Sequence, residues 1–371
     1  MTGLNEKNKL KLRQVCFILL AFVPVTKISL LPAIIAGLCE EQLWAATVIN
    51  VFLDLLVILS IMALLKKHGN TPIFTVVEKS LSKPLARALY LGYGLYFLIK
   101  AVIPLLEQQD YIQNVLYEVT PSVVIFLPFF IVSFYTSLKG MKIIGRCADV
   151  ACFVTAMGLG LVLFLSVLNG NYKNLLPIVQ KPTYRLINGC FATLPWYSDG
   201  VYMLMFIGHF YEEKRQTGKV FFSYLSGGVF TVFIMVTFYA VFGPIAKTQY
   251  LAVPEMTIFS VAIANAARFD YVGIFLLLFS QVFAIILPVF LSVKCFERAL
   301  SLKNSLWPAI IVNGALAIFV TVFDNKLFTV LDFIVKSLWP VFVLFGDLVP
   351  PTLLLIPKIP SERRKIEKPT T

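Results

Sequence analysis

The sequence predicts an all-α polytopic membrane protein with ten transmembrane helices, of which the first and the sixth are broken near their middles. Three observations lead to this prediction. Hydrophobic residues make up 58% of the 371 residues and charged residues only 14%, whereas soluble domains carry about 25% charged residues. Ten apolar windows are long enough to cross a bilayer. Two of these windows, at equivalent places in the two halves, are interrupted by proline and a charged residue.

The ten expected spans fall into two groups of five. The first group, 14–168, contains the windows 14–38, 42–65, 86–109, 121–138 and 147–168. The second group, 186–357, contains the windows 186–210, 219–243, 270–293, 305–323 and 337–357. A group with an odd number of spans reverses its orientation when it is repeated, so a 5+5 chain forms an inverted repeat. We therefore expect a single integral membrane domain over residues 1–371.

The basic residues predict the orientation of this domain in the bilayer. Most of the 32 lysines and arginines lie in the N-terminal segment 1–13, in alternate loops and in the tail 358–371. Basic loops of membrane proteins face the cytoplasm. Both termini are therefore expected in the cytoplasm, and the net charge of +12 needs no nucleic-acid partner to explain it.

The first window is interrupted by Pro24 and Lys27, with the hydroxyls of Thr26 and Ser29 beside them. Proline lacks a backbone donor and clashes with the preceding turn, so a helix bends or breaks there. An unpaired lysine near the bilayer centre costs about 3 kcal/mol. This combination is typical of a discontinuous helix that lines a binding site. The alternative is a kinked helix whose lysine meets a carboxylate for structural reasons.

The sixth window carries a matching interruption, Pro-Trp-Tyr-Ser-Asp-Gly over residues 195–200. Interrupted segments at corresponding places of two repeats indicate a central binding site. The start of the second half-helix near Ser29, together with Lys27, suits a carboxylate. The carbonyls before Ser198 and the side chain of Asp199 suit an ammonium group. A zwitterion of amino-acid size would satisfy both, but Lys27 and Asp199 could also pair with each other and leave room for a less polar ligand.

Span 3 contains further polar candidates. Tyr93 and Tyr96 lie on one helical face, where they could close over a ligand or pack in the interior. Lys100 is one turn further along and Glu107 two turns beyond it, roughly on one face. The two could form a polar track towards the exterior, but we expect Lys100 to pair with Asp54 or Asp149. No nucleophile–base pair, phosphate loop or paired carboxylates indicate an enzyme, and the scattered cysteines and two histidines predict neither a metal site nor a cofactor.

Several stretches resemble the B-subunit family of spore germinant receptors, within the amino acid–polyamine–organocation superfamily. The resemblance is diffuse but covers nearly the whole chain in the expected order. The stretches that carry it are 9–20, Leu30-Leu31-Pro32, Lys67 to Glu78, Gly140 to Asp149, Asn174 to Ile178, and Arg268 to Lys294.

This resemblance implies a leucine-transporter-like fold and a role in sensing small nutrients, commonly amino acids, in the inner membrane of a dormant spore. It also implies a larger membrane A subunit and a lipoprotein C subunit as partners. Helices 1, 3, 6 and 8 supply ligand contacts in the superfamily. The corresponding residues here are Thr26, Lys27, Ser29, Tyr93, Tyr96, Tyr197, Ser198, Asp199, Gly200, Ser280, Gln281 and Phe283. At the position of Ser280 and Gln281 in helix 8, members of the superfamily often bind a sodium ion or have a side chain in its place. A hydrogen bond between helices is the alternative role for these two residues.

The charged break at Lys27 and the Trp-Tyr-Ser-Asp-Gly segment depart from the family pattern. Two other functions therefore remain open. The chain could be a secondary transporter of amino acids or organic ions, coupled to protons or sodium, or a structural or channel-like subunit whose binding site has decayed.

Overall fold

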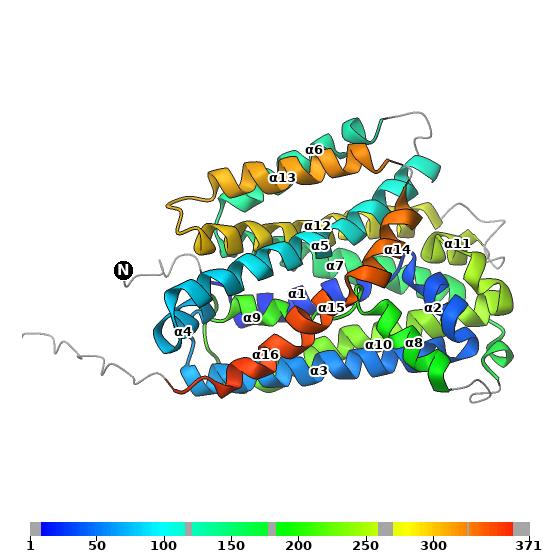
Figure 1. Ribbon diagram of the computed structural model, residues 1–371. Coiled ribbons are helices and arrows are strands. Elements are labelled where there is room, and N and C mark those ends of the chain that lie inside the picture. Colours follow the sequence, from blue (N-terminus) through cyan, green and yellow to red (C-terminus); the bar gives the residue numbers. More distant parts are fainter. Residues whose placement is uncertain (1–8, 116–120, 177–182, 259–269, 325, 359–371) are drawn as a thin grey trace, which may run out of the picture.

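Helices form the regular structure of the chain in the residues that the computed structural model describes, which are 9–115, 121–176, 183–258, 270–324 and 326–358 (Figure 1). The N-terminal segment 1–8 and the tail residues 359–371 lie outside these residues. Part of the basic residues from which the orientation was predicted therefore lies outside the described structure. The helical elements are α1 (Leu12–Val25), α2 (Leu31–Cys39), α3 (Leu43–His68), α4 (Ile73–Ser80), α5 (Lys83–Val115), α6 (Ser122–Leu138), α7 (Met141–Val167), α8 (Thr183–Thr193), α9 (Tyr202–Phe206), α10 (Gln216–Phe242), α11 (Ala252–Ile258), α12 (Asp270–Ala299), α13 (Leu306–Val322), α14 (Leu327–Ser337), α15 (Trp339–Phe342), the π-helix η6 (Val343–Leu348) and α16 (Val349–Thr352).

Both predicted helix breaks are present. The first apolar window forms α1 and α2, and helical structure is lost between Val25 and Leu31. The sixth window forms α8 and the short helix α9, which are separated by the residues between Thr193 and Tyr202. Proline near the end of α1 and in the second break removes backbone donors that a continuous helix needs. The interruption that the sequence predicted is therefore a property of the fold in both halves.

A helix that the sequence did not predict lies between the ninth and tenth windows. The tenth window, 337–357, covers the apolar helical stretch Trp339–Leu355, and α14 (Leu327–Ser337) precedes it, with Leu338 between the two. Four apolar residues of α14 are buried, namely Leu327, Val330, Leu331 and Ile334. The pair formed by Asp332 and Lys336 on its exposed side lowers the average hydropathy, which hides this amphipathic helix from a window method.

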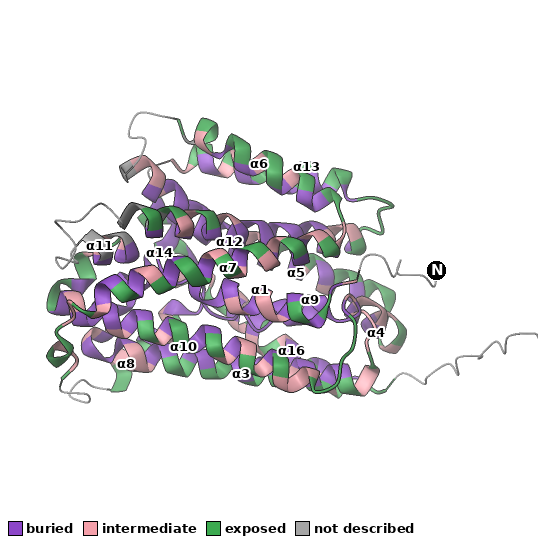
Figure 2. Cartoon of the chain, turned by 180° about the vertical axis from the view of Figure 1, so that it is seen from behind, coloured by how far each residue is buried: buried purple, intermediate pink, exposed green. Residues whose placement is uncertain are grey.

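The apolar surface of the bundle identifies a multi-pass membrane protein. Five of the described helices are long and apolar enough to cross a membrane, and a sixth crossing arises if α13 and α14 count as one bent span. Large apolar side chains such as Phe153, Phe164, Phe275 and Ile318 are more than half exposed. Figure 2 shows exposed residues along α6 and α13, which lie side by side. The count of ten spans remains a prediction.

The interior is organised around α5 and α12, which pack along each other, while α1 packs against α7 and α10 (Figure 1). One backbone connection joins the beginning of α1 to the end of α9. Leu10 N donates to His209 O at 2.8 Å, and Tyr211 N donates to Leu10 O at 2.9 Å. The ends of α1 and α9 that lie away from the two breaks are therefore tied together.

The close packing of α10 on α3 gives a testable prediction. A Cβ atom on Gly228 would lie 2.4 Å from Val51 Cγ1, whereas one on Gly218 of the same helix would meet nothing within 4 Å. Gly228→Ala should therefore destabilise the protein by about 1–3 kcal/mol. Gly218→Ala should leave stability unchanged or raise it, because alanine favours helix. Thermal unfolding in detergent compares the two variants, and equal midpoints would contradict this packing.

Candidate functional site

Lys27 caps the broken end of α1. Its Nζ donates to Val23 O at 3.0 Å and to Thr26 Oγ1 at 3.0 Å. Thr26 Oγ1 in turn donates to Phe22 O at 3.1 Å. The last carbonyls of a helix have no intrahelical donor, and basic side chains near a helix end can meet them. The lysine therefore supplies the hydrogen bonds that the break removes.

Lys100 of α5 plays the same part at the second break. Its Nζ donates to Pro195 O at 3.2 Å and also to Tyr197 O. These carbonyls follow α8, where the chain leaves the helical ladder. Lys100 therefore holds the second break from a neighbouring helix.

Asp199 joins the two lysines. Its Oδ2 lies 2.5 Å from Lys27 Nζ and its Oδ1 lies 2.7 Å from Lys100 Nζ. The three side chains are at most 4% exposed. An ammonium group has three donors, and each lysine here has three acceptors. We refer to Lys27, Asp199 and Lys100 as the central charge cluster.

The predicted partner of Lys100 was wrong. Asp54 accepts hydrogen bonds from Tyr224 Oη at 2.5 Å and from Gly200 N at 3.3 Å. Asp149 Oδ1 lies 3.1 Å from Arg13 Nη2, near the start of α1. Helical spacing predicts which face Lys100 occupies but not that the break at 195–198 turns its free carbonyls towards that face.

Most predicted residues at the breaks gather around this cluster. Tyr96 Oη donates to Ser198 O at 3.0 Å, and Lys27 Nζ lies 5.0 Å from the centre of the Tyr197 ring, within reach of a cation–π interaction. Together with the cluster itself, the residues brought together are Thr26, Tyr96, Tyr197, Ser198 and Gly200.

The remaining predicted residues make other contacts. Tyr93 Oη donates to Phe345 O at 3.2 Å, Ser280 Oγ donates to Leu276 O of its own helix at 3.0 Å, and Phe283 is buried in the apolar core. None of these three contacts involves the central charge cluster. A ligand-binding role for them remains a prediction.

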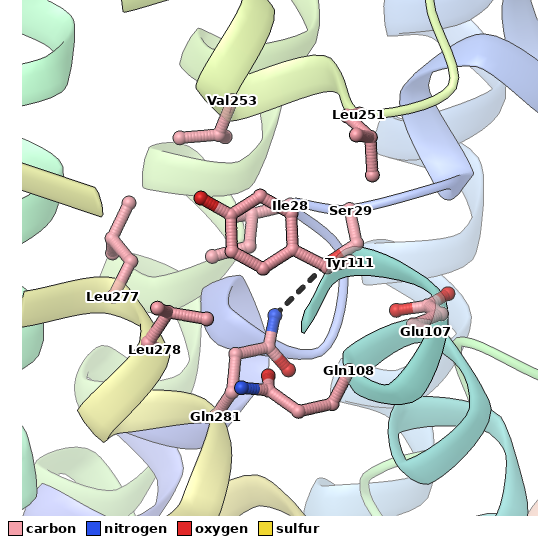
Figure 3. A pocket seen from close by; sticks show the side chains of 10 residues that line it. All are labelled: Ile28, Ser29, Glu107, Gln108, Tyr111, Leu251, Val253, Leu277, Leu278 and Gln281. Atoms are coloured by element: carbon pink, nitrogen blue, oxygen red, sulfur yellow. Dashed lines mark hydrogen bonds between the residues drawn. The ribbon is translucent and has the colours of Figure 1, made fainter. Parts of the chain in front are cut away.

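Ser29 and Gln281 line a small cavity next to the first break. Gln281 Nε2 donates to Ser29 Oγ at 3.0 Å and to Val25 O at 3.2 Å, which links α12 to the break (Figure 3). The cavity has a volume of about 30 Å³, which is room for a water molecule or an ammonium group but not for an amino acid. In this structure the space beside the first break is therefore too small for an amino acid.

Glu107 is a functional candidate that the sequence placed only on a track towards the exterior. Trp196 Nε1 donates to Glu107 Oε1 at 2.7 Å, which connects α5 to the second break. Glu107 Oε2 and Gln281 Oε1 are buried without a hydrogen-bond partner in the described structure, and both residues line the small cavity. Within the described residues, no three histidine, cysteine or acidic side chains gather as metal ligands.

These features define the class of the protein: an all-helical, multi-pass membrane protein with two broken helices that meet at a buried charge cluster. The sequence profile of the spore germination protein family matches residues 9–329. The chain belongs to this family. No curated protein matches the sequence.

Comparison with solved structures shows a fold shared with a membrane transporter. A Na⁺-coupled sialic acid symporter, solved in a substrate-bound outward-open state, superimposes with a TM-score of 0.55 at 11% identity. The match covers 90% of this chain and 79% of the symporter chain. The chain therefore has the transporter-like fold that the sequence predicted.

The shared carboxylate predicts an uneven response to mutation. Lys27→Met leaves Lys100 paired with Asp199, and the cost should be about 1–3 kcal/mol for the lost hydrogen bonds. Asp199→Asn leaves two buried ammonium groups without a counter-charge, and the cost should be about 3–5 kcal/mol. Thermal unfolding in detergent measures both, with Asp149→Asn at the exposed Arg13 pair as the control.

The double variant Lys27→Met/Asp199→Asn tests the same geometry. It removes one of the two uncompensated charges, so its midpoint should lie above that of Asp199→Asn alone. Strictly additive effects would show that Lys27 and Asp199 do not interact.

Proposed function

We propose that this chain is the nutrient-binding subunit of a spore germination receptor. In this proposal it lies in the spore inner membrane with both termini in the cytoplasm. A larger membrane A subunit and a lipoprotein C subunit act with it, as the family resemblance implies. The observation that carries the proposal is the junction of two broken helices at one buried charge cluster, in a chain of the spore germination family.

The ligand that fits this junction best is a small carboxylate or an amino acid. The cluster contains two ammonium groups and one carboxylate, so it has an excess positive charge for a ligand carboxylate. Glu107 Oε2, which has no hydrogen-bond partner in the described structure, offers an acceptor for a ligand ammonium group. Ligand and Asp199 would then compete for the same lysine donors.

This competition supplies a mechanism. A ligand shifts a conformational equilibrium only if its affinity differs between the two conformations. In this structure Lys27 and Lys100 each have three hydrogen-bond acceptors. The neighbouring cavity of about 30 Å³ is too small for an amino acid. Binding therefore requires an arrangement in which α1 and α8 have moved apart at their breaks, and the ligand stabilises that arrangement.

A second candidate function is secondary transport of an amino acid or organic ion. The observation that favours it is the fold shared with a Na⁺-coupled symporter. Receptor and transporter share this fold, so the fold cannot separate them. Counterflow of a radiolabelled ligand into proteoliposomes distinguishes the two, because a receptor subunit binds the ligand without accumulating it.

Ligand binding itself is testable with the purified protein. A calorimetric screen of amino acids and small carboxylates should find saturable binding, and Asp199→Asn, which removes the carboxylate that competes for the lysine donors, should raise the affinity for a small carboxylate while the protein remains inserted. Asp149→Asn removes a carboxylate outside the cluster and should keep wild-type affinity. Absence of binding in a folded sample with its partner subunits would contradict the proposal.

A further inference from the structure

A large cavity is lined by other segments than the small cavity of Figure 3. Its volume is about 720 Å³, within the range of small-molecule sites. Faces of three segments form it, namely α3, α8 and the C-terminal stretch from η6 to α16, which lie beside one another in Figure 1. The lining residues recur at helical spacing, for example Val343, Asp347 and Pro351. We call this space the lateral cavity.

Several apolar side chains that line the lateral cavity are also exposed on the surface of the bundle. Leu53, Leu56, Ile187 and Phe191 line it and are between 41% and 52% exposed. In a membrane protein, such side chains face the acyl chains of the bilayer. A molecule would therefore reach the cavity from the lipid phase, and its body must be apolar.

Asp347 supplies a carboxylate within these apolar walls. Asp347 Oδ2 accepts a hydrogen bond from Ser198 Oγ at 3.2 Å, and its other oxygen has no hydrogen-bond partner among the described residues. Asn50 Nδ2 donates to Thr193 Oγ1 at 3.0 Å and to Cys190 O at 3.3 Å, and Asn50 Oδ1 is fully buried, so a molecule in the cavity does not reach it. Asp347 is the single charged residue in the described lining.

We propose that the lateral cavity binds a membrane-partitioning primary ammonium ion with a short alkyl body. The alkyl body fills the apolar space, and the ammonium group donates to Asp347. A plain hydrocarbon chain would leave this carboxylate unsatisfied, and a carboxylate would face Asp347 with the same charge. The shape and the charge of the cavity thus select the same class of molecule.

The position of Asp347 connects this cavity to the second helix break. Its partner Ser198 adopts a left-handed backbone conformation with φ of 58°, which is strained for a residue with a side chain. A Cβ on Gly346 would lie 2.5 Å from Ser198 Cβ, so the π-helix packs directly on the break. Such π-helical stretches occur often at functional sites. An amine bound at Asp347 would therefore contact the carboxylate that accepts a hydrogen bond from Ser198, the residue before Asp199.

The experiment uses the full chain in phosphatidylcholine nanodiscs with n-octylamine as the probe. Octan-1-ol and octanoate are matched compounds with the same alkyl chain and a different head group. We expect a saturable rise in the thermal unfolding midpoint, with an apparent affinity for octylamine at least about 10-fold above that for octanol. Equal affinities for the three compounds would overturn the proposal in favour of hydrocarbon binding.

Variants locate the binding. Asp347→Asn should remove the preference for octylamine, while Asp347→Glu, which keeps the charge, should retain it. Asp332→Asn is the control, because Asp332 is an exposed carboxylate on α14 paired with Lys336. Loss of preference in Asp332→Asn but not in Asp347→Asn would overturn the assignment.

A second pair of variants tests the cavity itself. Leu53→Trp places an indole in the lining and should abolish octylamine binding, whereas Phe52→Trp changes an exposed neighbour outside the lining and should keep it. A phospholipid that copurifies with wild type and Asp347→Asn but not with Leu53→Trp, detected by native mass spectrometry, would identify a lipid as the occupant and overturn the proposal. Unchanged binding in Leu53→Trp would do the same.

Discussion

One carboxylate shared by two ammonium groups is the constraint on which the structure depends. Asp199 contacts Lys27 from the first broken span and Lys100 from α5. Removing a charge from water is costly, and a buried pair that loses one partner costs about 3–5 kcal/mol. The cluster therefore requires α1, α5 and the segment after α8 to meet at one point. The breaks also need the lysines, because Val23, Pro195 and Tyr197 carbonyls accept their hydrogen bonds.

Much of this arrangement could be predicted from the sequence. Proline and a charge within an apolar window indicate a broken helix, and Pro24 with Lys27 and Pro195 with Asp199 indicated both breaks in the correct places. The pairing of Lys27 with Asp199 was one of the alternatives left open. These predictions depend on local chain chemistry, which a sequence contains directly.

The parts that failed depend on how helices turn against one another. Spacing placed Lys100 on a face of span 3 but could not show that free carbonyls of the second break lie opposite it. Asp347 was missed, although a lone aspartate in an apolar window is itself a sign of a functional position. The helix α14 was not predicted, because Asp332 and Lys336 lower the average hydropathy of its stretch. The errors at Lys100 and Asp347 concern contacts between elements rather than the elements themselves.

The backbone link between Leu10 and the residues after α9 has a consequence for motion. The ring contact of Phe22 and Tyr202 at 4.6 Å adds to this link, so we expect α1 and α9 to move as one body. On the other side of the breaks, α2 packs against α8, and Arg185 of α8 lies 2.9 Å from Glu40 directly after α2, so we expect these two half-helices to move together as well. The four half-helices would then form two pairs that hinge at the breaks. Packed elements of this kind switch between discrete positions instead of deforming gradually, so we expect an all-or-none response.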